Sequence, residues 1–197
     1  ALEEALAKTL GVQREDLTEE LVAENLLSLD VSDKRVRDLK GLEVAQNLRI
    51  LVLRDNLIED VSPLGDLPNL SRLDLSGNRI RNLAPLESLS LSKMKTEVLR
   101  LQVALENRNL PKDQKAKLII ELSLVIQRIN RGHWSIRKLS LENNRLLGLS
   151  GIGHLTSLRH LDVSGNSLID LEGVGQLKNL ITLYAQQNQL GRVEGFI

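Results

Sequence analysis

Cysteine is absent from this sequence, so the chain contains neither a disulfide framework nor a thiolate metal site. No apolar run approaches the ~18 residues that a membrane-spanning helix needs. Charge of one sign is not in excess, because 26 basic and 26 acidic residues give a net charge of +0, and this balance argues against a general binder of nucleic acids or anionic membranes. Aromatic residues make up only 2% of the chain, which argues against a ready-made high-affinity hot spot on its surface.

A repeat of 22 residues is the dominant feature of what the sequence does contain. The pattern is Leu48-x-x-Leu51-x-Leu53-x-x-Asn56-x-Ile58, and it recurs in the same form from position 70. Repeats in the same frame also begin at Leu26, Ile136, Leu158 and Leu180. Self-similarity at this period is typical of a solenoid, in which each repeat buries its apolar side only by stacking on its neighbours. We therefore expect one elongated domain with a continuous core, although a chain of 197 residues could form one or two ordinary domains.

Each position of the repeat has a predicted place. The apolar residues at the first, fourth and sixth positions point inward from a short strand and its approach, and the residues between them point to solvent, because side chains alternate along a strand. The Asn at the ninth position turns the chain out of the strand. The Pro or Gly at the sixteenth position suits a tight return segment on the convex side. These residues are Pro63, Pro85, Gly151, Gly173 and Gly195.

The repeat resembles the leucine-rich repeat family, specifically the 22-residue type of internalins and bacterial surface proteins, over about three quarters of the chain. The resemblance implies an α/β fold, a right-handed solenoid with a parallel sheet on its concave face. It also implies that the Asn side chains are buried and bond backbone groups of neighbouring coils, and that Lys34 interrupts this row in the first repeat. The resulting Asn ladder would consist of Asn56, Asn78, Asn144, Asn166 and Asn188. A bacterial secreted or cell-surface location is favoured by the resemblance, with a cytoplasmic location left open.

Four segments follow from this frame within the one continuous domain. Residues 1–25 lie outside the repeats and predict a helical amino-terminal cap of two short helices, the second of which Thr18 caps. Residues 26–89 carry repeats one to three, residues 90–133 are an insertion, and residues 134–197 carry repeats four to six. A cap is expected because the first coil of a solenoid would otherwise expose its core.

The insertion of residues 90–133 allows two interpretations. Its 44 residues equal twice the repeat, so it could hold two decayed repeats. The spacing of its apolar residues is helical, which favours an inserted helical hairpin instead. The helical pattern comprises Leu91, Met94, Val98, Leu101 and Leu105, followed by Leu118, Leu122, Val125 and Ile129. We expect a hairpin whose second helix, apolar over more than half its surface, packs on both the first helix and the edge of the solenoid.

The junction and the ends of the chain add three expectations. Trp134 lies where the hairpin rejoins the repeats, and we expect it to be a packing anchor. The last repeat ends at Phe196 and Ile197 without a polar cap, so the chain is truncated, or these residues close the end locally, or the end packs on a partner. The chain begins at Ala1 without Met, which is compatible with the removal of a leader, a tag or a larger parent protein.

No catalytic, cofactor or metal site emerges from the residue pattern. His154 is expected on the convex return and His160 on the strand face, so these side chains do not converge as ligands. The Ser-Gly-Asn sequences at 76–78 and 164–166 are part of the repeat rather than a phosphate-binding loop. The many Asp residues lack the close spacing of an EF-hand calcium loop. We therefore expect a protein that is not an enzyme and that holds no cofactor or metal.

The strand face is the remaining candidate site. Its three outward-pointing rows, at the third, fifth and seventh positions of the repeat, are Ser28, Ile50, Arg72, Lys138, His160, Thr182; Asp30, Val52, Asp74, Ser140, Asp162, Tyr184; and Ser32, Arg54, Ser76, Glu142, Ser164, Gln186. The rows are compatible with a solvated face whose internal ion pairs are each worth at most ~1 kcal/mol, and with a polar surface for a partner, on which Tyr184 is the best aromatic anchor. The predicted protein-binding residues are Arg54, Arg72, Asp74, Lys138, Glu142, His160, Asp162, Tyr184 and Gln186.

Three functions are compatible with this picture. The favoured one is a non-enzymatic interaction module that binds a protein or peptide through the concave strand face, the hairpin or the cleft between them. The second is an assembly component that self-associates or docks in a larger complex through the hairpin or the carboxy-terminal coil. The third is a regulatory domain of an enzyme whose catalytic part lies outside this chain. None of them involves a nucleic acid or a membrane span.

Overall fold

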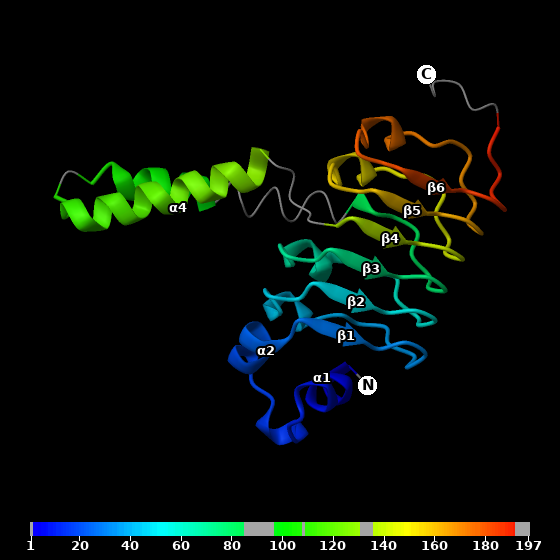
Figure 1. Ribbon diagram of the computed structural model, residues 1–197, viewed down its shortest axis with the longest axis horizontal. Coiled ribbons are helices and arrows are strands. Elements are labelled where there is room, and N and C mark those ends of the chain that lie inside the picture. Colours follow the sequence, from blue (N-terminus) through cyan, green and yellow to red (C-terminus); the bar gives the residue numbers. More distant parts are fainter. Residues whose placement is uncertain (1, 85–96, 108, 131–135, 192–197) are drawn as a thin grey trace.

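Six short parallel strands, one from each repeat, form a single sheet along the molecule (Figure 1). The computed structural model describes residues 2–84, 97–107, 109–130 and 136–191. The strands are β1 (Ser28–Asp30), β2 (Ile50–Val52), β3 (Arg72–Asp74), β4 (Lys138–Ser140), β5 (His160–Asp162) and β6 (Thr182–Tyr184). Their order in the sheet follows their order in the sequence, as it must when each coil stacks on the preceding one. The predicted fold class, a solenoid with a parallel sheet, is confirmed.

The core is built from rows of aliphatic residues that stack from coil to coil. The central residues of neighbouring strands pair in register, so that Leu29 meets Leu51, Leu51 meets Leu73, and the row continues to Leu183. The first five members of this row are at most 3% exposed, whereas Leu183 in the last described coil is only partly buried. Burial of one such side chain stabilises the fold by about 1.5–3 kcal/mol. Each coil gains this energy only from its neighbours, so stability grows with the number of stacked coils.

A left-handed residue follows the strand in every coil. The eighth position of the repeat has a positive φ in all six coils, between 53° and 66°. Its occupants are Asp33, Asp55, Gly77, Asn143, Gly165 and Gln187. Glycine adopts this conformation without strain and Asn and Asp tolerate it better than other residues do. The Ser-Gly-Asn sequences at 76–78 and 164–166 are therefore turns of the repeat.

The convex side consists of short 3-10 turns that return the chain to the next strand. They are η2 (Leu42–Val44), η3 (Ser62–Asp66), η4 (Ile152–His154) and η5 (Val174–Gln176). Gly41, Gly151 and Gly173 precede three of these turns with φ near 90°, and in η3 the sixteenth position is instead Pro63, in the first turn. Pro85 and Gly195, at the same position of two other repeats, lie outside the described residues.

The ninth-position Asn side chains join neighbouring coils. Asn78 Nδ2 donates to the carbonyl oxygens of Leu53 in the preceding coil and Leu75 in its own, both at 2.9 Å, and its Oδ1 accepts from the Ile58 N–H at 3.0 Å. Asn56, Asn144, Asn166 and Asn188 repeat this pattern. In the first coil, Lys34 occupies the ninth position, and the Lys34 backbone N–H donates to Asn56 Oδ1 at 3.1 Å. Each amide thus satisfies buried backbone groups that the irregular turn leaves without partners.

The stack continues without a break across the insertion. β3 pairs directly with β4, which places Leu73 opposite Leu139 although 66 residues of sequence separate them. Asn144 Nδ2 donates to the Leu75 carbonyl oxygen at 2.9 Å, and the Ile80 N–H donates to Asn144 Oδ1 at 3.0 Å. The helical excursion is therefore looped out between two adjacent coils, as the sequence predicts.

The amino-terminal end is covered by the predicted helical cap. It contains α1 (Leu2–Leu10), η1 (Arg14–Asp16) and α2 (Glu19–Asn25). The Leu21 N–H donates to Thr18 Oγ1 at 3.2 Å, which caps α2. Leu6 and Val22 are buried and belong to the same core as the coils. The first coil is consequently closed off from solvent at this end.

The insertion forms a helical hairpin. Residues 97–105 are helical, and α4 (Lys112–Asn130) returns beside them. Arg100 pairs with Glu97 on its own helix and with Glu121 of α4, at 2.6 and 3.4 Å. The described residues of the insertion contain no strand, so the interpretation as two decayed repeats is wrong for them. Trp134, the expected packing anchor, and the terminal Phe196 and Ile197 lie outside the described residues.

The hairpin projects away from the solenoid (Figure 1). Among the described elements, α4 approaches no strand, 3-10 turn or cap helix of the solenoid closely. The expectation that the second helix packs on the solenoid edge is therefore wrong. β3 and β4 pair directly with each other, so the hairpin is not part of the stack.

Removal of the insertion tests this architecture. Deletion of residues 90–133 joins Leu89 to Trp134 and restores the 22-residue frame, because 44 residues are two repeats. We expect the shortened chain to unfold in one cooperative transition with the strand signal retained and the helical signal reduced, as measured by circular dichroism during thermal melting. An unfolded or aggregated product would show that the insertion is part of the stack.

The Asn ladder gives a second prediction. Asn78→Ala should lower the free energy of unfolding by about 2–4 kcal/mol, since buried backbone groups left without a partner cost about 1–3 kcal/mol each. Chemical denaturation measures this loss. Asn47→Ala is the matched control, because the Asn47 side chain also donates to a backbone carbonyl of the preceding element, Glu24 of α2, but is exposed. Equal losses in the two variants would contradict a special role for the buried row.

Candidate functional site

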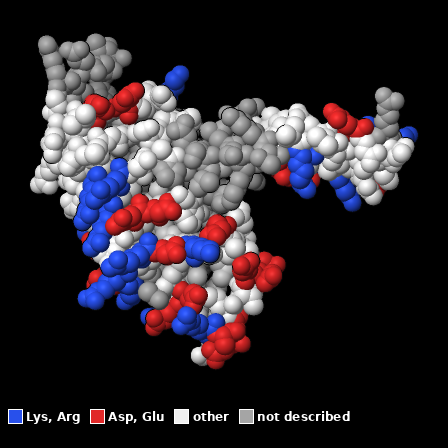
Figure 2. Space-filling model, turned by 180° about the vertical axis from the view of Figure 1, so that it is seen from behind, with Lys and Arg blue, Asp and Glu red and all other residues white. Residues whose placement is uncertain are grey.

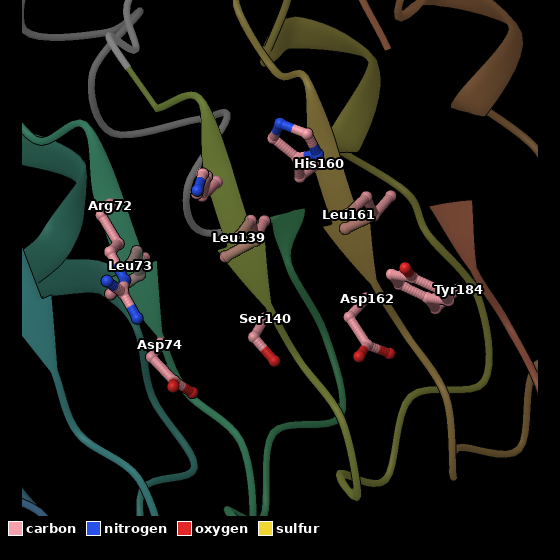
Figure 3. Close-up of a pocket in the computed structure, with 10 residues that line it drawn as sticks. Arg72, Leu73, Asp74, Leu139, Ser140, His160, Leu161, Asp162 and Tyr184 are labelled. Carbon is pink, nitrogen blue, oxygen red and sulfur yellow. The ribbon is translucent and has the colours of Figure 1, made fainter. Parts of the chain in front are cut away.

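A shallow depression of about 200 Å³ lies on the strand face, over β3 to β6 (Figure 3). It is lined by Arg72, Leu73, Asp74, Lys138, Leu139, Ser140, His160, Leu161, Asp162 and Tyr184. The three leucines belong to the buried central row, and the other side chains point outward because strand side chains alternate. The insertion separates the two parts of this surface in the sequence, and the pairing of β3 with β4 brings them together.

A basic row crosses the depression. Arg72, Lys138 and His160 occupy paired positions on β3, β4 and β5, and adjacent strands lie about 4.8 Å apart. Arg72 and Lys138 are exposed, and neither forms an ion pair with any part of the chain that the structure describes. His160 Nδ1 lies 3.2 Å from Thr182 Oγ1, a hydrogen-bonding distance. The sequence allowed two interpretations of this face, a solvated surface with internal ion pairs and a surface for a partner. The structure does not support internal ion pairs of Arg72 and Lys138.

An acidic row runs parallel to the basic one, two residues further along the strands. Asp74 Oδ1 accepts hydrogen bonds from the Ser76 backbone N–H at 3.1 Å and from Ser76 Oγ at 2.6 Å. Asp162 Oδ1 accepts from the Ser164 N–H at 3.0 Å. Both carboxylates are half-buried. Their orientation is fixed by their own turn, so they lose little freedom when a ligand binds.

The same Asp-x-Ser turn occurs in the first coil. Asp30 Oδ1 accepts from Ser32 Oγ at 2.6 Å and from the Ser32 N–H at 2.9 Å. These two hydrogen bonds, the side-chain one foremost, lower the pKa of the Asp30 carboxyl below its ordinary value. Asp30 lies outside the depression, and we attribute to it a role in the turn.

Tyr184 closes the depression at β6. Its side chain is 49% exposed, and its hydroxyl has no hydrogen-bond partner among the described residues. It pairs in register with Asp162 on β5, so an aromatic ring and a carboxylate stand side by side. Figure 3 shows the Tyr184 ring next to Asp162 at one end of the depression and Arg72 at the other.

Three of the nine predicted binding residues lie outside the depression. Arg54 pairs with its neighbour Asp55 at 3.2 Å, Glu142 accepts from Asn143 Nδ2 at 3.3 Å, and Gln186 accepts from Ser164 Oγ at 2.7 Å. All three are at the seventh position, beyond the strands. The structure therefore brings together six of the predicted residues, which are Arg72, Asp74, Lys138, His160, Asp162 and Tyr184.

The sequence analysis placed Ser140 on the strand face but not among the binding residues, and it missed a second row of Asn side chains. Ser140 contributes to the depression, and its Oγ lies 2.6 Å from Ser76 Oγ of the neighbouring coil, a contact between side chains 64 residues apart. A second ladder joins the coils on the convex side, where Asn69 donates to the Gln46 carbonyl oxygen at 2.9 Å. Asn179 makes the equivalent bond to Thr156, and Asn47 bonds the Glu24 carbonyl oxygen of the cap helix α2. The available signal for this ladder was an Asn immediately before the first Leu of three repeats.

The chemistry of the depression favours recognition of an exposed surface group. Its volume is below the ~300–1,000 Å³ of typical small-molecule sites. Within the described residues, no group of three His, Asp or Glu side chains is close enough to hold a metal ion. No helix in the same part of the chain has the length and apolar character required to cross a membrane. What remains is a polar surface with cations on one side, carboxylates on the other and one aromatic ring.

Comparison by sequence finds one family. A model described as leucine-rich repeats in two copies matches residues 46–95 and 134–177, on either side of the insertion. No curated protein matches the chain.

Comparison by structure finds other solenoids. An internalin (inlF) from Listeria monocytogenes aligns with 98% of this chain at 21% identity and a TM-score of 0.44, and an internalin C2 (inlC2) from the same organism aligns with 98% at 22% identity and the same TM-score. The leucine-rich repeat ectodomain of the Arabidopsis thaliana receptor kinase GASSHO1/SCHENGEN3 aligns with 87% at 20% identity and a TM-score of 0.55. The chain spans 57%, 86% and 16% of these three proteins.

The free basic residues lead to a stability prediction. Arg72→Ala and Lys138→Ala should each change the free energy of unfolding by less than about 0.5 kcal/mol, because exposed side chains without partners contribute little to stability. Leu73→Ala on the same strand is the control and should cost about 2–5 kcal/mol, as expected for a core leucine. A loss above about 1 kcal/mol for either basic residue in urea denaturation would mean that internal ion pairs hold it.

Proposed function

Because the chain belongs to the leucine-rich repeat family, we propose that the depression on its strand face binds an extended segment of a partner protein. The leucine-rich repeat fold is typically a non-enzymatic platform for protein–protein interaction. The observation that carries the finer proposal is the pair Arg72 and Lys138, exposed on adjacent strands and without an internal ion pair among the described residues.

An acidic group of the partner is the natural ligand for the basic row. Arg72 can donate two parallel hydrogen bonds to a carboxylate, and Lys138 adds a point charge one strand away. Such charge-assisted bonds are shorter and about twice as strong as neutral ones. His160 extends the row and adds a donor or an acceptor according to its tautomer. An Asp, a Glu or a terminal carboxylate of the partner would fit here.

The other side of the depression, formed by Asp162 and Tyr184, favours a different chemical group of the partner. Asp162 offers a carboxylate fixed by its turn, and Tyr184 offers a half-exposed ring and a free hydroxyl beside it. A basic side chain can pair with the carboxylate and stack on the ring. The two rows are two residues apart along the strands, about 6.6 Å, and the pair Asp162 and Tyr184 lies two strands from the pair Arg72 and Lys138, about 9.6 Å. An extended segment whose acidic and basic residues are three or four positions apart matches the combined separation of about 12 Å.

The affinity for such a segment should be modest. The depression is small and offers one aromatic anchor, whereas tight interfaces centre on several buried aromatic or Arg residues. Weak and transient encounters bury less than about 1,200 Å² in total. We therefore expect dissociation constants on the order of micromolar. The plant ectodomain reported above was solved in complex with Casparian strip integrity factor 2, so a related solenoid does hold a protein ligand.

A random peptide library displayed on phage tests the proposal directly. Selection on the purified protein should enrich sequences with an acidic and a basic residue three or four positions apart. Binding of the enriched peptides should weaken at least about tenfold with Arg72→Ala/Lys138→Ala, since each lost charge-assisted bond is worth about 1.5–3 kcal/mol. Calorimetry or fluorescence anisotropy measures the change, and binding should also weaken with added salt.

Matched controls separate this site from general charge attraction. Arg145→Ala/Arg159→Ala removes two exposed arginines that do not line the depression and should leave peptide affinity unchanged. Tyr184→Ala removes the aromatic ring that lines the depression and should reduce peptide affinity. Peptides that bind equally well to Arg72→Ala/Lys138→Ala and to the native chain would overturn the proposed site.

A further inference from the structure

The turns that follow the strands form a second outward face, which we call the flank. It lies on the side of the solenoid away from the hairpin (Figure 1). Here the Arg79 N–H donates to the Ile58 carbonyl oxygen, and the Arg145 N–H donates to the Ile80 carbonyl oxygen, both at 2.9 Å. Ile80 and Leu146, at the eleventh position of the repeat, are fully buried. The tenth and twelfth positions on either side of them therefore point outward, because side chains alternate along an extended chain.

Two large aliphatic side chains stand exposed on the flank in neighbouring coils. Leu147 and Ile169 both occupy the twelfth position of their repeats, 22 residues apart, and are 66% and 62% exposed. Their coils are adjacent because β4 pairs with β5, and hydrogen-bonded backbones lie about 4.8 Å apart. The two side chains thus form one apolar patch. Exposed apolar residues are common on protein surfaces, so the neighbouring side chains decide what the patch can bind.

Three arginines border the apolar patch. Arg145 lies two residues before Leu147 in the same coil, and Arg79 and Arg81 occupy the same two positions of the adjoining coil. Arg79 is half-buried, and Arg81 and Arg145 are exposed. None of the three forms an ion pair with any residue that the structure describes. Figure 2 shows Lys and Arg side chains gathered along the edge of the solenoid away from the hairpin, with uncharged surface continuing toward the carboxy-terminal coils.

The carboxylates around the flank leave these arginines uncompensated. Glu59 holds the twelfth position of the coil before Arg81, yet the two side chains form no ion pair. The other carboxylates bond groups of their own turns at 2.8, 3.3 and 3.0 Å, and they are Asp60, Glu142 and Asp170. Arg79 and Arg145 share one position on neighbouring coils, and like charges placed opposite each other cost free energy. An anion supplied by another molecule would remove this cost.

We infer that the flank is a second docking surface, whose occupant is a segment of a partner protein that carries a large apolar residue near carboxylates. The apolar residue covers Leu147 and Ile169, and the carboxylates accept hydrogen bonds from Arg79, Arg81 and Arg145. A guanidinium group can hold a carboxylate by two parallel hydrogen bonds. Coverage of the apolar patch excludes water beside these bonds and lowers the local dielectric, which strengthens them. Charge and apolar complementarity therefore act on the same segment.

The spacing on the flank sets the pattern of this segment. Arg145 and Leu147 are two residues apart in one extended chain, about 6.6 Å, and Arg81 and Ile169 are two coils apart, about 9.6 Å. An extended segment advances about 3.3 Å per residue. Its apolar residue and the nearest carboxylate should therefore lie two or three positions apart. This pattern differs from the acidic and basic pair expected at the depression.

A protein segment fits the flank better than an anionic membrane does. Membrane attachment of a surface element grows with its buried apolar area and with its attraction to anionic lipids. The flank offers two aliphatic side chains, and the whole chain has a net charge of +0. The flank is also separate from the strand face, so a partner can occupy it while the depression stays open. The inference thus goes beyond the proposed ligand site and does not depend on it.

Selection of a random peptide library on the Arg72→Ala/Lys138→Ala variant tests the inference, because this variant lacks the basic row of the depression. We expect enrichment of peptides with a large apolar residue and a carboxylate two or three positions apart. The enriched peptides should bind the native chain equally well in fluorescence anisotropy. Leu147→Ser/Ile169→Ser and Arg79→Gln/Arg145→Gln should each weaken their binding at least about tenfold. Circular dichroism checks that both variants remain folded.

Matched controls lie before the strands, at the second position of the repeat. Arg137→Gln/Arg159→Gln also removes two exposed arginines from neighbouring coils, and Ile181→Ser removes an aliphatic side chain that is 70% exposed. Both should leave the affinity for the enriched peptides unchanged. A selection without acidic and apolar enrichment overturns the inference, as do peptides that bind the two flank variants as tightly as the native chain. Binding to phosphatidylglycerol vesicles that Leu147→Ser/Ile169→Ser abolishes would assign the flank to a membrane and also overturn it.

Discussion

The Asn side-chain amide at the ninth position of five of the six coils is the interaction that holds these coils in one continuous stack. The strands have only three residues each, and most of every coil is irregular, so many backbone groups have no partner in a ladder of strands. Each Asn at the ninth position satisfies such groups in its own coil and in the preceding one. The leucine rows supply most of the apolar energy, but they would tolerate small shifts between coils. Hydrogen bonds to fixed backbone groups do not, so the Asn row sets the register.

This register explains how the chain accommodates a long insertion. Asn144 bonds the Leu75 carbonyl oxygen as Asn78 bonds that of Leu53, although the first pair is separated by 69 residues and the second by 25. The coil after the insertion therefore stacks as if nothing had intervened. The candidate site depends on this continuity, because Arg72 and Asp74 come from one side of the insertion and Lys138 to Tyr184 from the other. The same continuity leaves the hairpin outside the stack.

Much of the fold and of the strand face could be predicted from the sequence, because a residue's position in the repeat determines its place in the coil. The inward leucines, the strand-face rows and the pairing of β3 with β4 all follow from a frame of 22 residues, and the frame survives the insertion because Ile136 resumes it in phase. The direction of the hairpin could not be predicted. A wide apolar stripe on α4 indicates a second neighbour but does not say whether the solenoid or another molecule provides it. Whether Arg72 and Lys138 pair with Asp74 and Asp162 was equally open, because it depends on how Ser76 and Ser164 orient the carboxylates. The local partners of Arg54, Glu142 and Gln186 could not be predicted either, since Arg54 and Glu142 contact their sequence neighbours Asp55 and Asn143, and Gln186 contacts Ser164 of the preceding coil.

The direct stacking of the coils on either side of the insertion can be measured with engineered cysteines, because the native chain has none. Ser76 Oγ and Ser140 Oγ are 2.6 Å apart, so Ser76→Cys/Ser140→Cys should form an intramolecular disulfide in the folded protein under mild oxidation. Ser76→Cys/Ser164→Cys, which places the thiols two strands and about 10 Å apart, should not. Mass spectrometry of unreduced tryptic peptides reads out the link. A disulfide in the first variant alone is the predicted result, and free thiols in the first variant, or equal cross-linking in both, would contradict the stacked arrangement on which the candidate site rests.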